Sequence, residues 1–220
     1  MTVVRHAKFR AVVFDADSTL AAIEGIDWLG ELRGSAVGAQ ITDLTNRAMS
    51  GELPLEEVYA ARLGIIRPTL AEIDALAAAY IGSVEPGAAE LIRDLHDSGM
   101  QLHIVSGGLK QALLPLAAAL GVSAECVHAV ELVHDERGKY VSLADDQPLS
   151  RQDGKPRVVR ALALPRPSVI VGDGSTDLMV RGDTDLFVAY TAVVRRSAVV
   201  AGADFEAHSF AALQSILFTL

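Results

Sequence analysis

The chain has 220 residues, of which 50% are hydrophobic and 21% are charged, and this composition excludes disorder as its dominant state. Its 19 lysines and arginines stand against 28 aspartates and glutamates, a formal net charge of −9 that argues against a surface coating nucleic acid. A single cysteine, Cys126, excludes an internal disulfide and a metal cage of cysteines.

No segment is expected to cross a membrane. The longest apolar stretches, such as residues 112–122, are too short to span a bilayer and contain Pro115 or Gly121. The amino terminus carries charges and lacks the apolar segment of a signal peptide. Together with the single cysteine, these features predict a cytoplasmic protein with neither a membrane nor nucleic acid as a partner.

Five short apolar runs rich in β-branched residues predict strands that are buried on both faces. They cover residues 11–14, 102–105, 127–130, 168–171 and 186–189. Helical patterns alternate with them at residues 86–97, 109–120, 154–164, 175–181 and 210–217. This alternation favours an α/β fold, a doubly wound parallel sheet with a Rossmann-like core.

One long region interrupts the alternation of strands and helices. Residues 21–81 contain only helix-like stretches punctuated by glycine and proline, and a plain loop of that length does not fit a compact domain. We therefore expect a small helical-bundle cap at 21–81, inserted after the first strand. The α/β catalytic core would then consist of residues 1–20 and 82–220. A β-hairpin is expected further along, from residues 130–133 and 140–143.

Polar and small residues follow the predicted strands at the edge where ligands bind in open parallel sheets. These residues are Asp15 and Asp17 after the first strand, Ser106, Gly107 and Gly108 after the second, and Asp173 and Asp177 after the fourth. Four acids without a histidine cluster or cysteine ligands suit a hard ion that prefers oxygen ligands. Magnesium is the natural choice.

The same residues can support phosphoryl transfer. An aspartate can attack phosphorus to form an aspartyl-phosphate, while a second carboxylate protonates the leaving alkoxide and later accepts a proton from water. The phosphoryl oxygens need donors and cations, which Ser106, the backbone amides of Gly107 and Gly108, and Lys155 can provide. Each of these short motifs occurs often by chance. Their occurrence in this order, each at the end of a predicted strand or the start of a predicted helix, makes the set specific for a phosphoryl-transfer site.

These residues resemble the four motifs of the haloacid dehalogenase superfamily. The motifs are residues 15–19, 106–108, Lys155 and 172–177. Within the superfamily, the form of the first motif and the segments 24–27, 46–49 and 61–63 are similar to the phosphoserine phosphatase branch. The resemblance covers residues 12–188, nearly all of the chain.

The resemblance implies a catalytic role for each motif. Asp15 would be the nucleophile and Asp17 the general acid and base. Magnesium would be held by the Asp15 carboxylate, the Asp17 backbone carbonyl and Asp173, and Asp177 would support the metal site without binding the ion. Ser106, Gly107 and Lys155 would hold the transferring phosphoryl group.

The resemblance also implies a small phosphorylated substrate with an amino-acid end. Thr176 would lie near this substrate. In the cap, Glu24 would meet the substrate ammonium group, Arg62 would bind its carboxylate, and Met49 would line the pocket. An arginine can grip a carboxylate through two parallel hydrogen bonds. The activity implied is the hydrolysis of L-phosphoserine to L-serine and phosphate.

Two alternatives stay open at this stage. An enzyme of the same fold could act on another small phosphate ester, or transfer the phosphoryl group to an alcohol such as homoserine. A catalytically silent binding domain is disfavoured, because Asp15, Asp17, Lys155 and Asp173 are all present. The sequence predicts no oligomeric state.

Some positions depart from the family pattern. Ser50 and Leu55 stand where relatives often have glycine and phenylalanine, and residues 189–192 replace a glycine-rich turn. Arg195 is the candidate for an arginine on the substrate side in some relatives, although its spacing is shifted. Tyr59 is expected to pack in the core rather than to contact a ligand.

Overall fold

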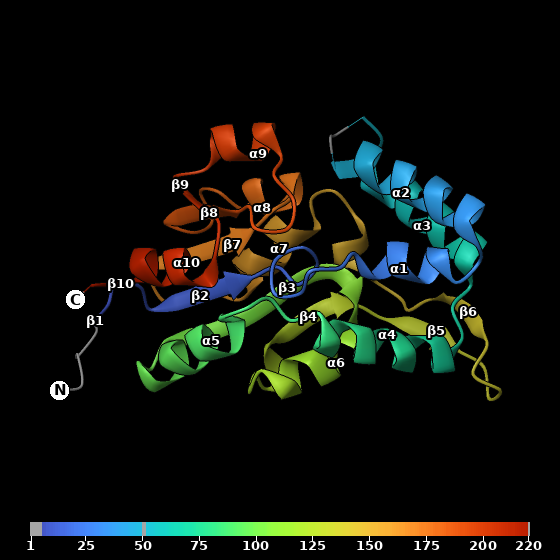
Figure 1. Ribbon diagram of the computed structural model, residues 1–220, viewed down its shortest axis with the longest axis horizontal. Helices are drawn as coiled ribbons and strands as arrows, with labels where there is room; N and C mark the ends of the chain where they lie inside the picture. The colour runs from blue at the N-terminus through green and yellow to red at the C-terminus, as the bar shows by residue number, and fades with distance from the viewer. Residues whose placement is uncertain (1–5, 50–51, 220) are drawn as a thin grey trace.

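The computed structural model describes residues 6–49 and 52–219, and a six-stranded parallel sheet lies at its centre (Figure 1). The strands run in the order β4-β3-β2-β7-β8-β9. Their bounds are β2 (Ala11–Phe14), β3 (Gln101–Leu109), β4 (Val127–Val130), β7 (Ser168–Gly172), β8 (Leu186–Tyr190) and β9 (Phe205–Ala207). The predicted α/β sheet is confirmed, and β9 is an additional edge strand.

The register of the central strands brings their carboxyl ends together. Phe14 at the end of β2 pairs with Ile104 of β3 on one side and Val171 of β7 on the other. All four residues of β2 are fully buried, because helices cover both faces of the sheet. Residues that follow β2, β3 and β7 therefore meet at one edge.

Helices flank the sheet as expected for a doubly wound fold. On one side lie α5 (Ala88–Asp97) and α6 (Lys110–Ala119), and on the other α8 (Ser175–Leu178) and α9 (Ser197–Gly202) (Figure 1). The other core helices are α7 (Gly154–Ala161) and α10 (Phe210–Leu217). Phe210 of α10 stacks on Phe14, with ring centroids 6.3 Å apart.

Four of the five helices that the structure describes between β2 and β3 belong to the insertion, and the fifth is the core helix α5. The four are α1 (Gly25–Glu31), α2 (Ser35–Met49), α3 (Leu55–Ile66) and α4 (Leu70–Gly82). Helices α1, α2 and α3 pack on one another at one end of the molecule, whereas α4 lies beside the core helix α6 (Figure 1). Buried side chains of the insertion, such as Leu63 and Leu76, belong to the same hydrophobic core as the sheet. Helix α4 therefore anchors the insertion to the core.

The two chain segments that join the insertion to the sheet run side by side. Ala21 and Val84 form an antiparallel bridge. The Ala22 N–H donates to the Ser83 carbonyl at 2.8 Å, and the Glu85 N–H donates to the Leu20 carbonyl at 2.9 Å. The insertion therefore leaves and re-enters the core at one place.

The remaining elements are short. The predicted hairpin is confirmed, with β5 (Leu132–His134) antiparallel to β6 (Tyr140–Leu143). Near the termini, β1 (His6–Ala7) pairs with β10 (Phe218–Thr219), and two 3-10 turns, η1 (Ala124–Cys126) and η2 (Pro148–Ser150), lie in the connections. Among the described residues, no helix combines the length and the apolar character that a membrane span requires.

Candidate active site

Asp15 lies at the carboxyl edge of the sheet, directly after β2. Its backbone N–H donates to the Val171 carbonyl at 2.9 Å and so continues the pairing with β7. The side chain is buried, and Oδ1 accepts the Ala16 N–H at 2.7 Å. The chain then turns sharply through Ser18, which has a φ of 50°. The predicted nucleophile is therefore held at the centre of the sheet's carboxyl edge.

Lys155 supplies a buried positive charge to this edge. It lies in the first turn of α7, and its Nζ is 2.6 Å from Asp15 Oδ2 and 2.6 Å from Asp177 Oδ1. Burial alone would lower the pKa of Lys155, but the two carboxylates outweigh burial and raise it. Lys155 is therefore protonated at neutral pH and places a positive charge beside the Asp15 carboxyl group.

Three buried carboxylates form a group that could hold a metal ion. Oxygen atoms of Asp15, Asp173 and Asp177 all lie within 4.8 Å of one another. Burial and the neighbouring Asp15 raise the pKa of Asp173 to about 6, although Arg196 opposes this shift. Crowded acidic oxygens of this kind suit a hard metal ion that prefers oxygen ligands and would relieve their repulsion.

Asp177 stands behind the other two carboxylates. It is fully buried, and its Oδ2 accepts the Gly174 N–H at 3.1 Å while Oδ1 accepts a hydrogen bond from Lys155. A Cβ at Gly172 would lie 2.2 Å from the Asp177 carboxyl carbon. Glycine at position 172 is therefore required for Asp177 to reach Lys155.

The end of β3 provides polar groups next to Asp15. Ser106 is fully buried, and its Oγ accepts the Gly108 N–H at 3.1 Å. The Gly107 carbonyl accepts the Tyr59 hydroxyl of α3 at 2.8 Å. Tyr59 is buried as predicted, yet it also borders the pocket. Helix α3 is thereby tied to the segment that is expected to hold the phosphoryl group.

Asp17 faces the insertion. Its Oδ1 accepts hydrogen bonds from the Tyr80 hydroxyl at 2.6 Å and from the Gly25 N–H at 2.8 Å. Burial and the nearby Asp15 carboxylate raise the pKa of Asp17 to about 7, against the opposing effect of these hydrogen bonds. A carboxyl group with such a pKa can both give and accept a proton near neutral pH.

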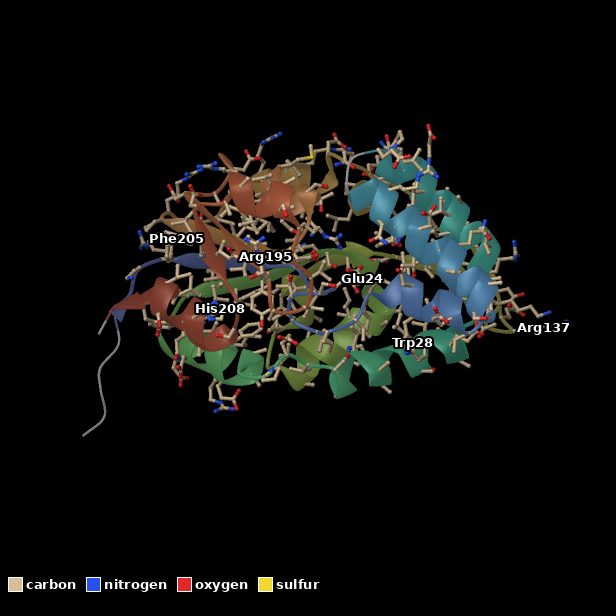
Figure 2. The ribbon with its side chains drawn as sticks, turned by 45° about the horizontal axis from the view of Figure 1, so that its top comes forward. Glu24, Trp28, Arg137, Arg195, Phe205 and His208 are labelled. Carbon is tan, nitrogen blue, oxygen red and sulfur yellow. The ribbon has the colours of Figure 1, made fainter. Side chains whose placement is uncertain are left out.

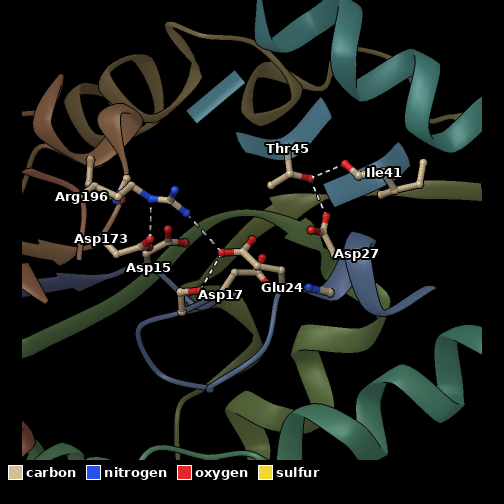
Figure 3. A network of polar contacts seen from close by, with 12 residues as sticks. Asp15, Asp17, Glu24, Asp27, Ile41, Thr45, Asp173 and Arg196 are labelled. Atoms are coloured by element: carbon tan, nitrogen blue, oxygen red, sulfur yellow. Dashed lines mark hydrogen bonds and ion pairs between the residues drawn. The ribbon is translucent and has the colours of Figure 1, made fainter. Parts of the chain in front are cut away.

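Glu24 lies where the insertion meets the sheet, far from Arg137 at the tip of the hairpin (Figure 2). Its Oε1 accepts the Ser18 hydroxyl at 2.7 Å and lies 3.8 Å from Nη2 of Arg196 (Figure 3). Arg196 also donates through Nε to Asp173 Oδ2 at 3.2 Å. Burial raises the pKa of Glu24 well above its usual value, and the Asp17 and Asp173 carboxylates raise it further.

Arg62 is buried in α3 with part of its guanidinium group unpaired. Nη1 donates to Thr45 Oγ1 at 2.7 Å and lies 3.9 Å from Asp27 Oδ1. The guanidinium carbon lies 5.5 Å from the centre of the Tyr59 ring. Nε is buried and has no hydrogen-bond partner among the described residues. Buried donors are seldom left unpaired, which singles out Nε of Arg62, a residue that lines the same pocket as Tyr59.

One pocket brings most of the predicted residues together. It encloses about 620 Å³, including its opening to solvent. The predicted site residues that line it are Asp15, Asp17, Glu24, Arg62, Ser106, Gly107, Lys155, Asp173 and Thr176. Asp177 is buried beside it, and the side chain of Met49 lies outside the described residues, as does Ser50.

The sequence interpretation missed several side chains at or near the site, among them Arg151, which lines the pocket. Arg196 reaches Asp173 and Glu24, whereas its neighbour Arg195 pairs at the surface with Glu206, Nε to Oε1 at 2.8 Å. Arg195 therefore points away from the acidic residues of the site, and it is Arg196 that contacts them. Tyr80 and Thr45 were also missed, because neither lies in a recognisable motif.

Acidic side chains gather around one pocket where the central strands of the α/β sheet end, the position of ligand-binding and active sites in folds of this kind. The chain belongs to the haloacid dehalogenase-like hydrolase family, whose sequence model matches residues 12–180. The predicted resemblance to this family is thus confirmed.

Relatives and solved structures agree with this assignment. Over 208 aligned residues the chain is 36% identical to the chloroplastic phosphoserine phosphatase of Arabidopsis thaliana, covering 92% of this chain and 70% of the relative. It is 30% identical to the human phosphoserine phosphatase over 220 residues, covering 96% and 97%. A phosphoserine phosphohydrolase-like protein from Francisella tularensis superposes with a TM-score of 0.85 at 27% identity, covering 94% of this chain and 99% of that chain.

Proposed function

We propose that this protein hydrolyses L-phosphoserine to L-serine and phosphate through an aspartyl-phosphate intermediate. The observation that carries the proposal is the placement of Glu24 and Arg62, one acid and one guanidinium, in the same pocket as Asp15. A phosphorylated amino acid has an ammonium group, a carboxylate and a phosphate, and this pocket offers a partner for each. The relatives named phosphoserine phosphatase support the same substrate.

In the first half of the reaction, an oxygen of the Asp15 carboxylate attacks phosphorus. The bond between phosphorus and the serine oxygen breaks, and its electron pair stays on that oxygen. Asp17 gives this oxygen a proton, so that serine leaves as a neutral alcohol while the phosphoryl group remains on Asp15. Lys155 Nζ lies 2.6 Å from Oδ2 of Asp15, beside the attacking carboxyl group.

In the second half, a water molecule attacks the phosphoryl group on Asp15. Asp17, now a carboxylate, takes a proton from this water, and the bond between phosphorus and the Asp15 oxygen breaks. Phosphate leaves, and both aspartates return to their starting forms. Lys155, Ser106 and the backbone at Gly107 hold the phosphoryl oxygens through both halves, and Thr176 lies near the substrate.

The donor set fits a magnesium ion as cofactor. We propose that the Asp15 carboxylate, the Asp17 backbone carbonyl and Asp173 hold it, and that Asp177 supports them through its hydrogen bonds to Lys155 and Gly174. When bound, the ion would offset the negative charge of the phosphoryl oxygens. Its presence would also lower the pKa values of the crowded carboxylates.

The insertion supplies the part of the site that selects the substrate. Residues 21–81 are proposed as the cap and residues 1–20 and 82–220 as the catalytic core. Glu24 would pair with the substrate ammonium group, and the unpaired Nε of Arg62 would donate to its carboxylate. Met49 is proposed to line the same pocket.

We also propose a cytoplasmic location for the protein. Its single cysteine, Cys126, fits a reducing compartment.

The test measures phosphate release from L-phosphoserine with Mg²⁺ by the wild type and by Asp15→Asn. Loss of the nucleophile should reduce the rate by more than about 1,000-fold. Asp183→Asn is the matched control, because Asp183 pairs with Arg160 at the surface and should keep full rate. Beryllium fluoride should form a stable adduct on Asp15. A wild type that prefers a phosphate ester without an amino-acid end would refute the substrate.

A further inference from the structure

The hydroxyl group of Tyr80, a residue of the insertion, contacts a carboxylate of the candidate active site. Tyr80 is fully buried near the carboxyl end of α4, the helix that packs on α6. Its hydroxyl donates to Oδ1 of Asp17 at 2.6 Å, across 63 positions of sequence. The Gly25 N–H donates to the same oxygen at 2.8 Å. Two donors from the insertion thus converge on one oxygen of Asp17.

These two bonds distinguish the oxygens of Asp17. Oδ1 has both donors, so its lone pairs are directed at the insertion. Oδ2 lies beside the segment Ser106–Gly108, since a Cβ built on Gly108 would be 3.0 Å from it and 3.3 Å from Ser106 Oγ. Oδ2 is therefore the oxygen on the side where the phosphoryl group would be held.

The Tyr80 hydroxyl group packs tightly against the backbone of Gly25. A Cβ at Gly25 would lie 2.0 Å from the Tyr80 hydroxyl oxygen, so any side chain there would displace Tyr80 or α1. The hydroxyl has no other partner among the described residues, and a buried hydroxyl needs one. Tyr80 and Gly25 therefore form a single fitted contact with Asp17.

We propose that Tyr80 is a positioning residue that assigns the proton transfer to Oδ2 of Asp17. This inference rests on the proposed role of Asp17 as general acid and base. As the bond between phosphorus and the serine oxygen breaks, the proton moves from Oδ2 to that oxygen, and Oδ1 keeps its bonds to Tyr80 and Gly25. In the second half, Oδ2 takes the proton of the attacking water.

The variant Tyr80→Phe removes only the hydroxyl and should fold, which a thermal melt would check. Without it, Asp17 is held by Gly25 alone and can rotate away from the leaving group. We expect kcat/KM for L-phosphoserine to fall about tenfold with KM within twofold of the wild type. Rapid-quench formation of the aspartyl-phosphate from labelled phosphoserine should slow by the same factor. Gly25→Ala, which pushes the hydroxyl aside, should have a similar effect.

A second substrate separates positioning from general damage. p-Nitrophenyl phosphate has a leaving group that departs without a proton, so Tyr80→Phe should change its kcat/KM by less than threefold. Tyr190→Phe is the matched control, because this tyrosine is also fully buried and donates to one carboxylate, Glu85 Oε2, at 2.7 Å outside the pocket. Tyr190→Phe should leave kcat/KM for both substrates unchanged.

The inference would be overturned if Tyr80→Phe formed the aspartyl-phosphate at the wild-type rate, or if both substrates slowed equally. Failure of the proposed function would look different. In that case the wild type would release no phosphate from phosphoserine, or Asp17→Asn would keep full rate, whatever the behaviour of Tyr80→Phe.

Discussion

Replacing Arg62 by lysine tests how the pocket selects an amino-acid end. Arg62 is buried, its Nη1 donates to Thr45, and its Nε has no hydrogen-bond partner in the described part of the chain. Lysine keeps the positive charge but cannot offer the two parallel donors of a guanidinium group. The expected loss is therefore that of the hydrogen bonds to the substrate carboxylate.

The size of the loss follows from the number of bonds. A hydrogen bond to a charged group contributes about 1.5–3 kcal/mol, and about 1.4 kcal/mol corresponds to a tenfold change in binding. Arg62→Lys should therefore lower kcat/KM for L-phosphoserine by roughly 10- to 100-fold. O-phosphoethanolamine lacks the carboxylate, so its kcat/KM should change by less than about threefold.

The assay is phosphate release from both substrates by the wild type, Arg62→Lys and a control. Arg33→Lys is a suitable control, since Arg33 is also an arginine of the insertion but pairs with Glu72 at 2.6 and 2.8 Å. It should leave both substrates unchanged. Equal losses on phosphoserine and phosphoethanolamine would refute a contact between Arg62 and the carboxylate.

Three further predictions concern the metal site, its packing and an ion pair. Dialysis against a chelator should abolish phosphate release, and Asp173→Asn should raise the Mg²⁺ concentration for half-maximal rate at least about tenfold; activity that survives chelation would contradict both. Gly172→Ala should reduce activity at least about tenfold, because its Cβ would lie 2.2 Å from the Asp177 carboxyl carbon; an unchanged rate would show that Asp177 can move freely. The hydrogen bond from Arg33 lowers the pKa of Glu72 from 4.5 to about 2, so this pair stabilises the fold above pH 4.5 and ceases to do so as the pH falls toward 2. Chemical denaturation of Glu72→Gln should show a loss of about 1 kcal/mol at pH 7, reduced by solvent screening, and no loss near pH 2; a constant difference would refute the assignment.

The sheet and its catalytic edge were accessible from the sequence. Buried parallel strands leave apolar runs that are easy to see, and Asp15, Ser106 and Asp173 follow these runs directly. Their positions need no knowledge of distant contacts, because parallel strands place their carboxyl ends together. Strand β9 was not predicted, because it has only three residues, two of them exposed, and so forms no apolar run in the sequence.

Side chains contributed by irregular segments could not be placed in this way. The segment after β8 shows neither helical nor strand periodicity in its apolar residues. The sequence therefore does not indicate which of Arg195 and Arg196 points toward the site. Only the fold directs Arg196 to Asp173 and Arg195 to Glu206. Tyr80 meets Asp17 because α4 packs on α6, a tertiary contact that leaves no local pattern in the sequence.

The insertion leaves and re-enters the core at one place, which the bridge between Ala21 and Val84 marks. This geometry affects the conformational entropy that the chain loses on folding. Pairing β2 with β3 closes a loop that contains four additional helices. Because each doubling of loop length costs only about 0.6 kcal/mol, tripling the connection adds about 1 kcal/mol. Burial of a single large apolar side chain such as Leu63 offsets that amount. Helices inserted at such a point can therefore change in length and packing at a small entropic cost, while the strands of the sheet keep their pairing.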